Sequence, residues 1–154
     1  MLFVIHSQAN SSTWMLFMTV NSDSQVHVRI QNSADVVAAR QQGRALAAIA
    51  GFSHSNLTII ATAIAEVASN IVEYAKEGEV IITLVDDASK TGVEIVASDQ
   101  GPGIADVSTV MRDGYSTGKG PGIGLHGAKR LMDEFAIVSA TGTGTTVTMK
   151  KWVA

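Results

Sequence analysis

The segment GKGPGIGLHG, residues 118–127, contains five glycines in ten positions and runs directly into the amphipathic stretch AKRLMDEF. Each glycine adds backbone entropy that folding must remove, so this density indicates a local need for bare backbone. Glycines let backbone N–H groups approach anionic oxygens, and the N-terminus of a following helix adds the positive end of a dipole. The segment is therefore suited to bind a polyphosphate, while a flexible linker or a tightly packed loop is the structural alternative.

Two common phosphate-binding motifs do not account for this segment. A P-loop requires GxxxxGK[ST], but here Gly118-Lys119 is followed by glycine and the preceding glycine is one residue too close. The dinucleotide-binding pattern GxGxxG does match from Gly122 to Gly127, yet it should directly follow a strand and precede an acidic residue by about twenty positions. No aspartate or glutamate follows Glu134. Both motifs are therefore rejected.

A second candidate is the pair Glu66 and Asn70 in AEVASNIVEYA, residues 65–75. Residues four apart share one face of a helix, and the apolar neighbours indicate a largely buried helix. A carboxylate and a carboxamide together can hold Mg²⁺ and position a hydroxyl or a water. Taken alone, the pair is more typical of an ordinary exposed helix face.

Two further clusters follow predicted strands. In SDQGPGI, residues 98–104, Asp99 ends an apolar strand in front of Gly101 and Gly103. A carboxylate there can accept a hydrogen bond from an exocyclic amine such as that of adenine, and the glycines let a flat base lie near the backbone. A tight turn that begins with aspartate is the alternative. In ATGTGTTV, residues 140–147, threonine hydroxyls can meet a base or a water, or simply close a hairpin.

Apolar periodicity predicts the elements that must position these clusters. Helix 57–75 has Ser53 or Ser55 as its expected N-cap and Gly78 just beyond its end. Segment 14–20 is a candidate hairpin partner for the first strand. The expected elements are strands 25–30, 79–85, 92–98, 137–140 and 145–152, helices 33–50, 57–75, 105–112 and 122–135, and loops 99–103 and 116–121. Helices stacked on one face of a mixed, mostly antiparallel sheet form a two-layer α/β (α+β) sandwich.

Composition excludes several classes of protein. The 154 residues carry a net charge of −3 without a basic block, which argues against a nucleic-acid binder. There is no cysteine for a disulfide framework, and the four scattered histidines form no metal motif. The apolar N-terminal runs are too short to cross a membrane and lack a positive n-region. We expect one domain, residues 23–154, preceded by a leader or an extra edge strand, residues 1–22.

In chain order, the four clusters resemble the N, G1, G2 and G3 boxes of the GHKL ATPase family, whose ATP site is the Bergerat fold. The resemblance runs from about residue 25 to residue 152 and implies ATP and Mg²⁺ as ligands. It implies that Asn70 ligates Mg²⁺ on the phosphates, that Glu66 is the general base, and that Asp99, supported by Thr145, reads the adenine amine. It also implies a lid over residues 106–121. The other implied nucleotide contacts are Gly101, Gly103, Ile104, Gly118, Lys119, Gly120, Gly122, Ile123, Gly124 and Leu125.

Within that family, DQGPGI, DGYSTGKG, GLHGAKRLMDEF and GTTVTMKKW look like the RsbT-type serine-protein kinases of bacterial partner switching. This resemblance implies a cytoplasmic serine/threonine-protein kinase that phosphorylates STAS-domain proteins (RsbS- or RsbR-like) of the stressosome. On release it would activate an RsbU-like phosphatase, and a homodimer is one assembly that such relatives form. The related RsbW and SpoIIAB anti-sigma factors imply an alternative, a nucleotide-gated binding module with little or no kinase turnover.

Two residues depart from the kinase pattern. Pro121 replaces a small or aliphatic residue, and because it lacks an N–H it is expected to stiffen the lid. His126 stands where proline is usual, and we expect it to cap the helix rather than to contact phosphate.

Overall fold

The computed structural model describes residues 24–111 and 124–153. Its five strands are β1 (Gln25–Ile30), β2 (Gly78–Asp87), β3 (Lys90–Asp99), β4 (Glu134–Ala140) and β5 (Gly144–Trp152). They form one sheet in the order β1-β2-β3-β5-β4. Every described pairing is antiparallel, so the expectation of a mixed sheet is wrong. The expected strand 14–20 and loop 116–121 lie outside the described residues, and the division at residue 23 stays a prediction.

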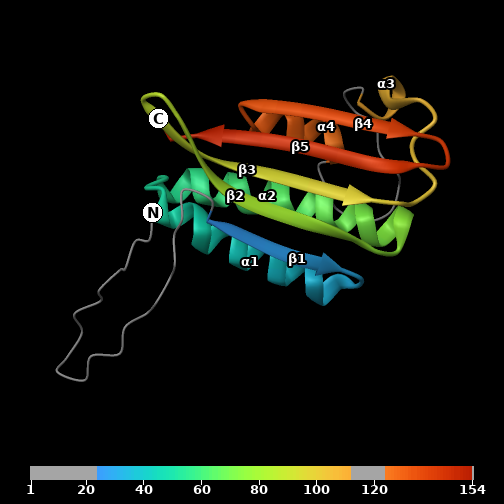
Figure 1. Cartoon of the computed structure of the whole chain (residues 1–154), viewed down its shortest axis with the longest axis horizontal. Helices are drawn as coiled ribbons and strands as arrows, with labels where there is room; N and C mark the ends of the chain where they lie inside the picture. Colours follow the sequence, from blue (N-terminus) through green and yellow to red (C-terminus); the bar gives the residue numbers. More distant parts are fainter. Residues whose placement is uncertain (1–23, 112–123, 154) are drawn as a thin grey trace.

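Helices cover one face of this sheet, as predicted (Figure 1). They are α1 (Ser33–Ile49), α2 (His54–Asn70) with the π-helical turn η1 (Ile71–Ala75), and α4 (Gly124–Leu131), while the short helix α3 (Val107–Val110) lies in the segment after β3. The long helices begin at side-chain caps that satisfy N–H groups without an intrahelical partner. The Asn32 side chain accepts from the backbone N–H of Asp35 at 3.0 Å. The Ser53 hydroxyl accepts from the backbone N–H of Asn56 at 3.2 Å, which confirms Ser53 as the N-cap of α2.

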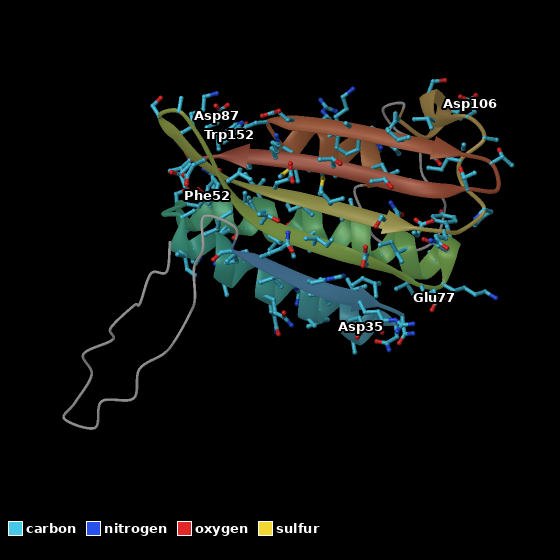
Figure 2. The ribbon with its side chains drawn as sticks, viewed as in Figure 1. Asp35, Phe52, Glu77, Asp87, Asp106 and Trp152 are labelled. Atoms are coloured by element: carbon cyan, nitrogen blue, oxygen red, sulfur yellow. The ribbon has the colours of Figure 1, made fainter. Side chains whose placement is uncertain are left out.

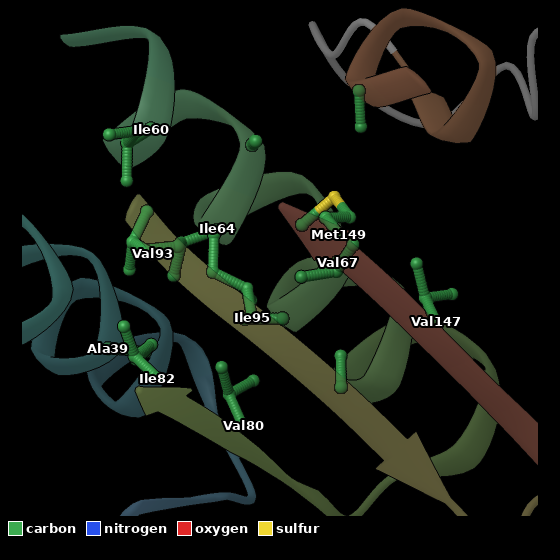
Figure 3. Close-up of a cluster of buried hydrophobic side chains, with 14 of the residues drawn as sticks. Ala39, Ile60, Ile64, Val67, Val80, Ile82, Val93, Ile95, Val147 and Met149 are labelled. Atoms are coloured by element: carbon green, nitrogen blue, oxygen red, sulfur yellow. The ribbon is translucent and has the colours of Figure 1, made fainter. Parts of the chain in front are cut away.

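The core lies between the sheet and the helices (Figure 3). Alternate residues of β3, Val93 and Ile95, are fully buried, as the period of two in a strand requires. Ile60 and Ile64 of α2 face them with no exposed surface. The stretch His54–Ala75 is long and apolar enough to span a membrane by length and composition. This stretch packs against α1, α4 and β3, and its buried apolar side chains belong to the core.

The expected helix 122–135 is wrong at its C-terminal end. α4 ends at Leu131, and β4 begins at Glu134. The backbone N–H of Asp133 donates to the carbonyl of Lys150 at 3.0 Å, so the chain already pairs with β5 there. The alternation in EFAIVSA then places every second residue of β4 toward the helices, which a helix could not do.

Candidate functional site

Helix α2 carries Glu66 and Asn70 on one face, one helical turn apart. Both side chains are half-buried. The Glu66 carboxylate accepts a hydrogen bond from the backbone N–H of Gly124, the first residue of α4, at 3.2 Å. The structure therefore brings the proposed base to a glycine of the glycine-rich segment, at the start of α4.

Asn70 is the last residue of α2 and is followed directly by the π-helical turn η1. Its side chain makes no capping hydrogen bond to that turn. π-helical turns are rare and recur at functional sites. The turn ends at Lys76, whose φ of 71° lies in a region that side chains rarely adopt. Asn70 therefore lies where the helix changes from α to π geometry, and its contact with a ligand stays a prediction.

The end of β3 places Asp99 beside two other strands. Asp99 is paired with Thr145 of β5, and Thr145 is paired with Ser139 of β4. Ala97 and Val147, each two positions from Asp99 and Thr145 in the same strand, are buried. Because alternate residues of a strand point to the same face, the side chains in this row of paired residues point toward the helical layer. The carboxylate oxygen Oδ1 of Asp99 accepts from the backbone N–H of Gly101 at 2.9 Å. Figure 2 labels Glu77 and Asp106 at this end of the sheet, with Asp87 and Trp152 at the opposite end.

The glycines of the loop after β3 pack against protein atoms. A Cβ on Gly101 would lie 2.6 Å from the Cβ of Ala75 in η1. A Cβ on Gly103, which has a φ of +76°, would lie 2.1 Å from the Ala140 carbonyl oxygen. The loop after β3 therefore packs closely against both η1 and the β4–β5 hairpin. That these glycines also admit a nucleotide stays a prediction.

Ser139 was not predicted as a site residue, yet its hydroxyl joins this loop to the β4–β5 hairpin. It accepts from the backbone N–H of Ile104 at 2.8 Å and lies 2.7 Å from the Thr145 hydroxyl. The sequence feature that could have identified Ser139 is the GTG turn, because this turn sets the register of the hairpin and places Ser139 opposite Thr145.

Helix α4 contributes Gly124 and Leu125 to the predicted site. Gly124 has a φ of +70°, and Leu125 is buried in the core. The Nδ1 atom of His126 is buried without a hydrogen-bond partner, so the expected capping bond is not made through this nitrogen. The predicted contacts Gly118, Lys119, Gly120, Gly122 and Ile123, with Pro121 and most of the expected lid, lie outside the described residues.

The donor set of the described residues fits Mg²⁺ bound together with a polyphosphate. No group of three or more histidine, aspartate or glutamate side chains that could hold a metal occurs in residues 24–111 and 124–153. Mg²⁺ typically takes one or two protein oxygens and completes its shell with water and phosphate. The carboxamide of Asn70, one turn from the carboxylate of Glu66, matches that requirement.

Comparison with known proteins gives a consistent result. Residues 30–151 match the histidine kinase-like ATPase domain (HATPase_c_2). The serine/threonine-protein kinase RsbT of Bacillus subtilis (strain 168) is 50% identical over 126 residues, which cover 82% of this chain and 95% of that kinase. The anti-sigma F factor of Thermoanaerobacter sp. (strain X514) is 31% identical over 98 residues, 61% of this chain and 68% of that factor.

A solved structure shares the fold. The RsbU and RsbW domains of Rv1364c from Mycobacterium tuberculosis align with a TM-score of 0.58 and 25% sequence identity. The alignment covers 82% of this chain and 32% of that longer chain.

Proposed function

Because this chain belongs to the family of histidine kinase-like ATPase domains, we propose that it is a serine/threonine-protein kinase that acts as a partner switch. The observation that carries this proposal is the contact of the Glu66 carboxylate with the start of α4, one helical turn along α2 from Asn70. Beyond phosphate binding, phosphoryl transfer to a hydroxyl needs a residue that orients the hydroxyl and a protein ligand for the metal, and Glu66 and Asn70 can supply the two. The 50% identity to a serine/threonine-protein kinase supports the same reaction.

Each residue has a definite task in this reaction. Asn70 would hold Mg²⁺ through its carboxamide oxygen, and the metal supplies charge neutralisation on the ATP phosphates when it is bound. Glu66 orients the acceptor hydroxyl and takes its proton. A bond forms between the acceptor oxygen and the γ-phosphorus, the bond from that phosphorus to the β–γ bridging oxygen breaks, and ADP leaves with the electron pair. Most of the catalysis is positioning and electrostatics.

The proposed adenine-binding site is the row of paired residues Asp99 and Thr145 at the end of the sheet. The Asp99 carboxylate accepts from the exocyclic amine of adenine, and the Thr145 hydroxyl lies beside it across the β3–β5 pairing. The contacts of Gly101 and Gly103 with the protein hold the intervening loop in place, so the base meets a formed surface. A formed surface lowers the ordering cost of binding.

The acceptor we propose is a serine or threonine of an RsbS- or RsbR-like STAS-domain protein in the cytoplasm. Release from the phosphorylated protein frees the kinase to bind and activate an RsbU-like phosphatase. The similarity to an anti-sigma F factor favours a second candidate, a nucleotide-gated binding module in which phosphoryl transfer is slow or absent.

The test is to incubate the protein with Mg·ATP and a STAS-domain protein from the same genome, and to measure the intact mass of that partner. We expect one added phosphoryl group with the wild type and none with Asn70→Ala or Glu66→Gln. The matched control is Asn56→Ala, which changes the same residue type at the other end of α2 and should leave phosphorylation intact.

The outcomes separate the two candidates. An unmodified STAS partner, with ATP binding and complex formation retained, would contradict the kinase proposal and favour the nucleotide-gated binding module. Phosphorylation that survives Asn70→Ala would contradict the role of this carboxamide. Failure to bind ATP would contradict both candidates.

A further inference from the structure

The hydroxyl of Ser139 contacts three polar groups at the end of the sheet. The backbone N–H of Ile104 lies 2.8 Å from Oγ, the carbonyl oxygen of Gly144 lies 3.2 Å away, and the Thr145 hydroxyl lies 2.7 Å away. All three distances are within the range of hydrogen bonds. The loop after β3 and both strands of the β4–β5 hairpin therefore meet at one hydroxyl group.

Counting hydrogens determines the direction of these bonds. A serine hydroxyl has one hydrogen to donate and two lone pairs to accept with. The Ile104 N–H can only donate, and the Gly144 carbonyl can only accept. Ser139 must therefore give its single hydrogen to Gly144, and Thr145 must give its own hydrogen to Ser139. This is the one assignment in which all three contacts are hydrogen bonds.

The consequence falls on Thr145, whose hydroxyl has no hydrogen left for a ligand and presents only lone pairs. Its pairing partner across the strands is Asp99, so the two side chains lie on the same face of the sheet. An ionised Asp99 carboxylate is also purely an acceptor. Two acceptors side by side favour a ligand group with two hydrogens and disfavour a carbonyl.

We propose that Ser139 is a positioning residue that makes the adenine-binding site selective for a 6-aminopurine over a 6-oxopurine. It does so by accepting the hydrogen bond of the Thr145 hydroxyl, which then has no hydrogen to donate to a ligand. An exocyclic amine can donate one hydrogen to Asp99 and the other to Thr145. A 6-oxo group would meet lone pairs from both. This inference rests on the ATP site proposed above, and it assigns a task to a residue that does not itself touch the nucleotide.

The experiment compares the binding of ATP and ITP to the full chain with Mg²⁺ by isothermal titration calorimetry. ITP has a carbonyl in place of the 6-amine and a hydrogen on N1. We expect wild type to prefer ATP by about 100-fold, since each mismatched polar contact costs about tenfold in affinity. In Ser139→Ala the Thr145 hydroxyl can rotate and donate to the carbonyl, so the preference should fall about tenfold.

Two further variants make the result specific. Thr145→Val removes the hydroxyl itself and should lower the ATP preference to the same extent, and adding Ser139→Ala to it should have no further effect on the preference. Thr143→Ala is the matched control, because its hydroxyl only closes the exposed hairpin turn by donating to the Ala140 carbonyl at 3.0 Å. If Ser139→Ala fails to fold by circular dichroism, Ser139→Cys carries the test, because its thiol is only a weak acceptor for the Thr145 hydrogen and the same fall in preference is expected.

The possible results bear on different claims. An unchanged preference in Ser139→Ala, or an equal loss of affinity for both nucleotides, would overturn this inference, because a merely structural role has that signature. A wild-type protein that binds ATP and ITP equally would overturn it while leaving the kinase proposal standing. A wild-type protein that binds neither nucleotide would overturn both.

Discussion

The Glu66 carboxylate and the backbone N–H of Gly124 are joined by a hydrogen bond of 3.2 Å, across 58 positions of sequence. The first N–H groups of a helix have no intrahelical partner, and a carboxylate placed there is favoured by the helix dipole. Glu66 therefore stabilises the start of α4 in addition to its proposed role as the base. The two roles predict different responses to different substitutions.

Glu66→Gln keeps a side-chain oxygen that can accept from Gly124 but removes the basic carboxylate. Glu66→Ala removes both. We expect both variants to lose phosphoryl transfer by at least about 100-fold. Only the alanine variant should also lose about 1 kcal/mol of unfolding free energy in urea and show faster hydrogen exchange at the Gly124 amide. Equal stability and equal exchange in the two variants would show that the bond to Gly124 contributes nothing.

The backbone of Gly144 packs closely against the end of β3. Its φ is +99°, and a Cβ there would lie 2.1 Å from the Asp99 carbonyl oxygen. Gly144→Ala should therefore displace Asp99, lower stability by about 2–3 kcal/mol and weaken ATP binding at least about tenfold. The measurements are a urea titration and calorimetric titration with ATP.

Gly142 provides the comparison within the same hairpin. Its φ is +81°, but a Cβ there would meet no atom within 4 Å. Gly142→Ala should cost only about 1 kcal/mol from backbone strain and leave ATP affinity unchanged. If both variants weaken ATP binding equally, the contact with Asp99 is not the cause.

Local patterns in the sequence were sufficient to predict most of the fold. Alternation of polar and apolar residues predicted β1, and apolar periodicity with a serine cap predicted α2. The end of α4 could not be read this way, because Ala128, Leu131, Met132 and Phe135 recur at the spacing of one helical face, so the local pattern favours a helix through Phe135. The hydrogen bond from the Asp133 N–H to the Lys150 carbonyl on β5 ends the helix earlier, and no local pattern contains that contact.

Part of the candidate site could likewise be predicted from local sequence patterns, and part could not. The four-residue spacing of Glu66 and Asn70 fixes a common face once the helix is given. Ser139 could not be found from its neighbours, because its partner Ile104 lies 35 positions away. The sequence also did not reveal a packing reason for Gly103, which is that the Ala140 carbonyl takes the space that a side chain would need.

Ser53 and Ser55 were both candidate caps for α2, and the structure distinguishes them. Ser53 accepts the hydrogen bond from the Asn56 N–H, whereas Ser55 lies inside the first turn. Ser53→Ala should lower the unfolding free energy by about 1 kcal/mol, and Ser55→Ala should change it by less than about half of that. Because both lie at the end of α2 away from Asn70, neither should alter ATP affinity. A larger effect for Ser55→Ala in thermal or urea unfolding would reverse the assignment.

Lys76 occupies a strained position beside the site. It follows η1 directly with φ 71° and ψ −39°, a conformation close to the rare γ-turn. Because its side chain is exposed, Lys76→Gly should relieve the strain at little packing cost and raise the unfolding free energy by about 1 kcal/mol.

Ala88, with a φ of 54° in the β2–β3 turn, is the matched position, and Ala88→Gly should give a similar gain. Since Ala88 lies at the opposite end of β2 from Asn70, a change in ATP affinity in Lys76→Gly alone would show that the strained turn helps to position the carboxamide. A loss of stability in Lys76→Gly, measured by urea unfolding beside Ala88→Gly, would instead mean that the lysine side chain contributes more than its backbone strain costs.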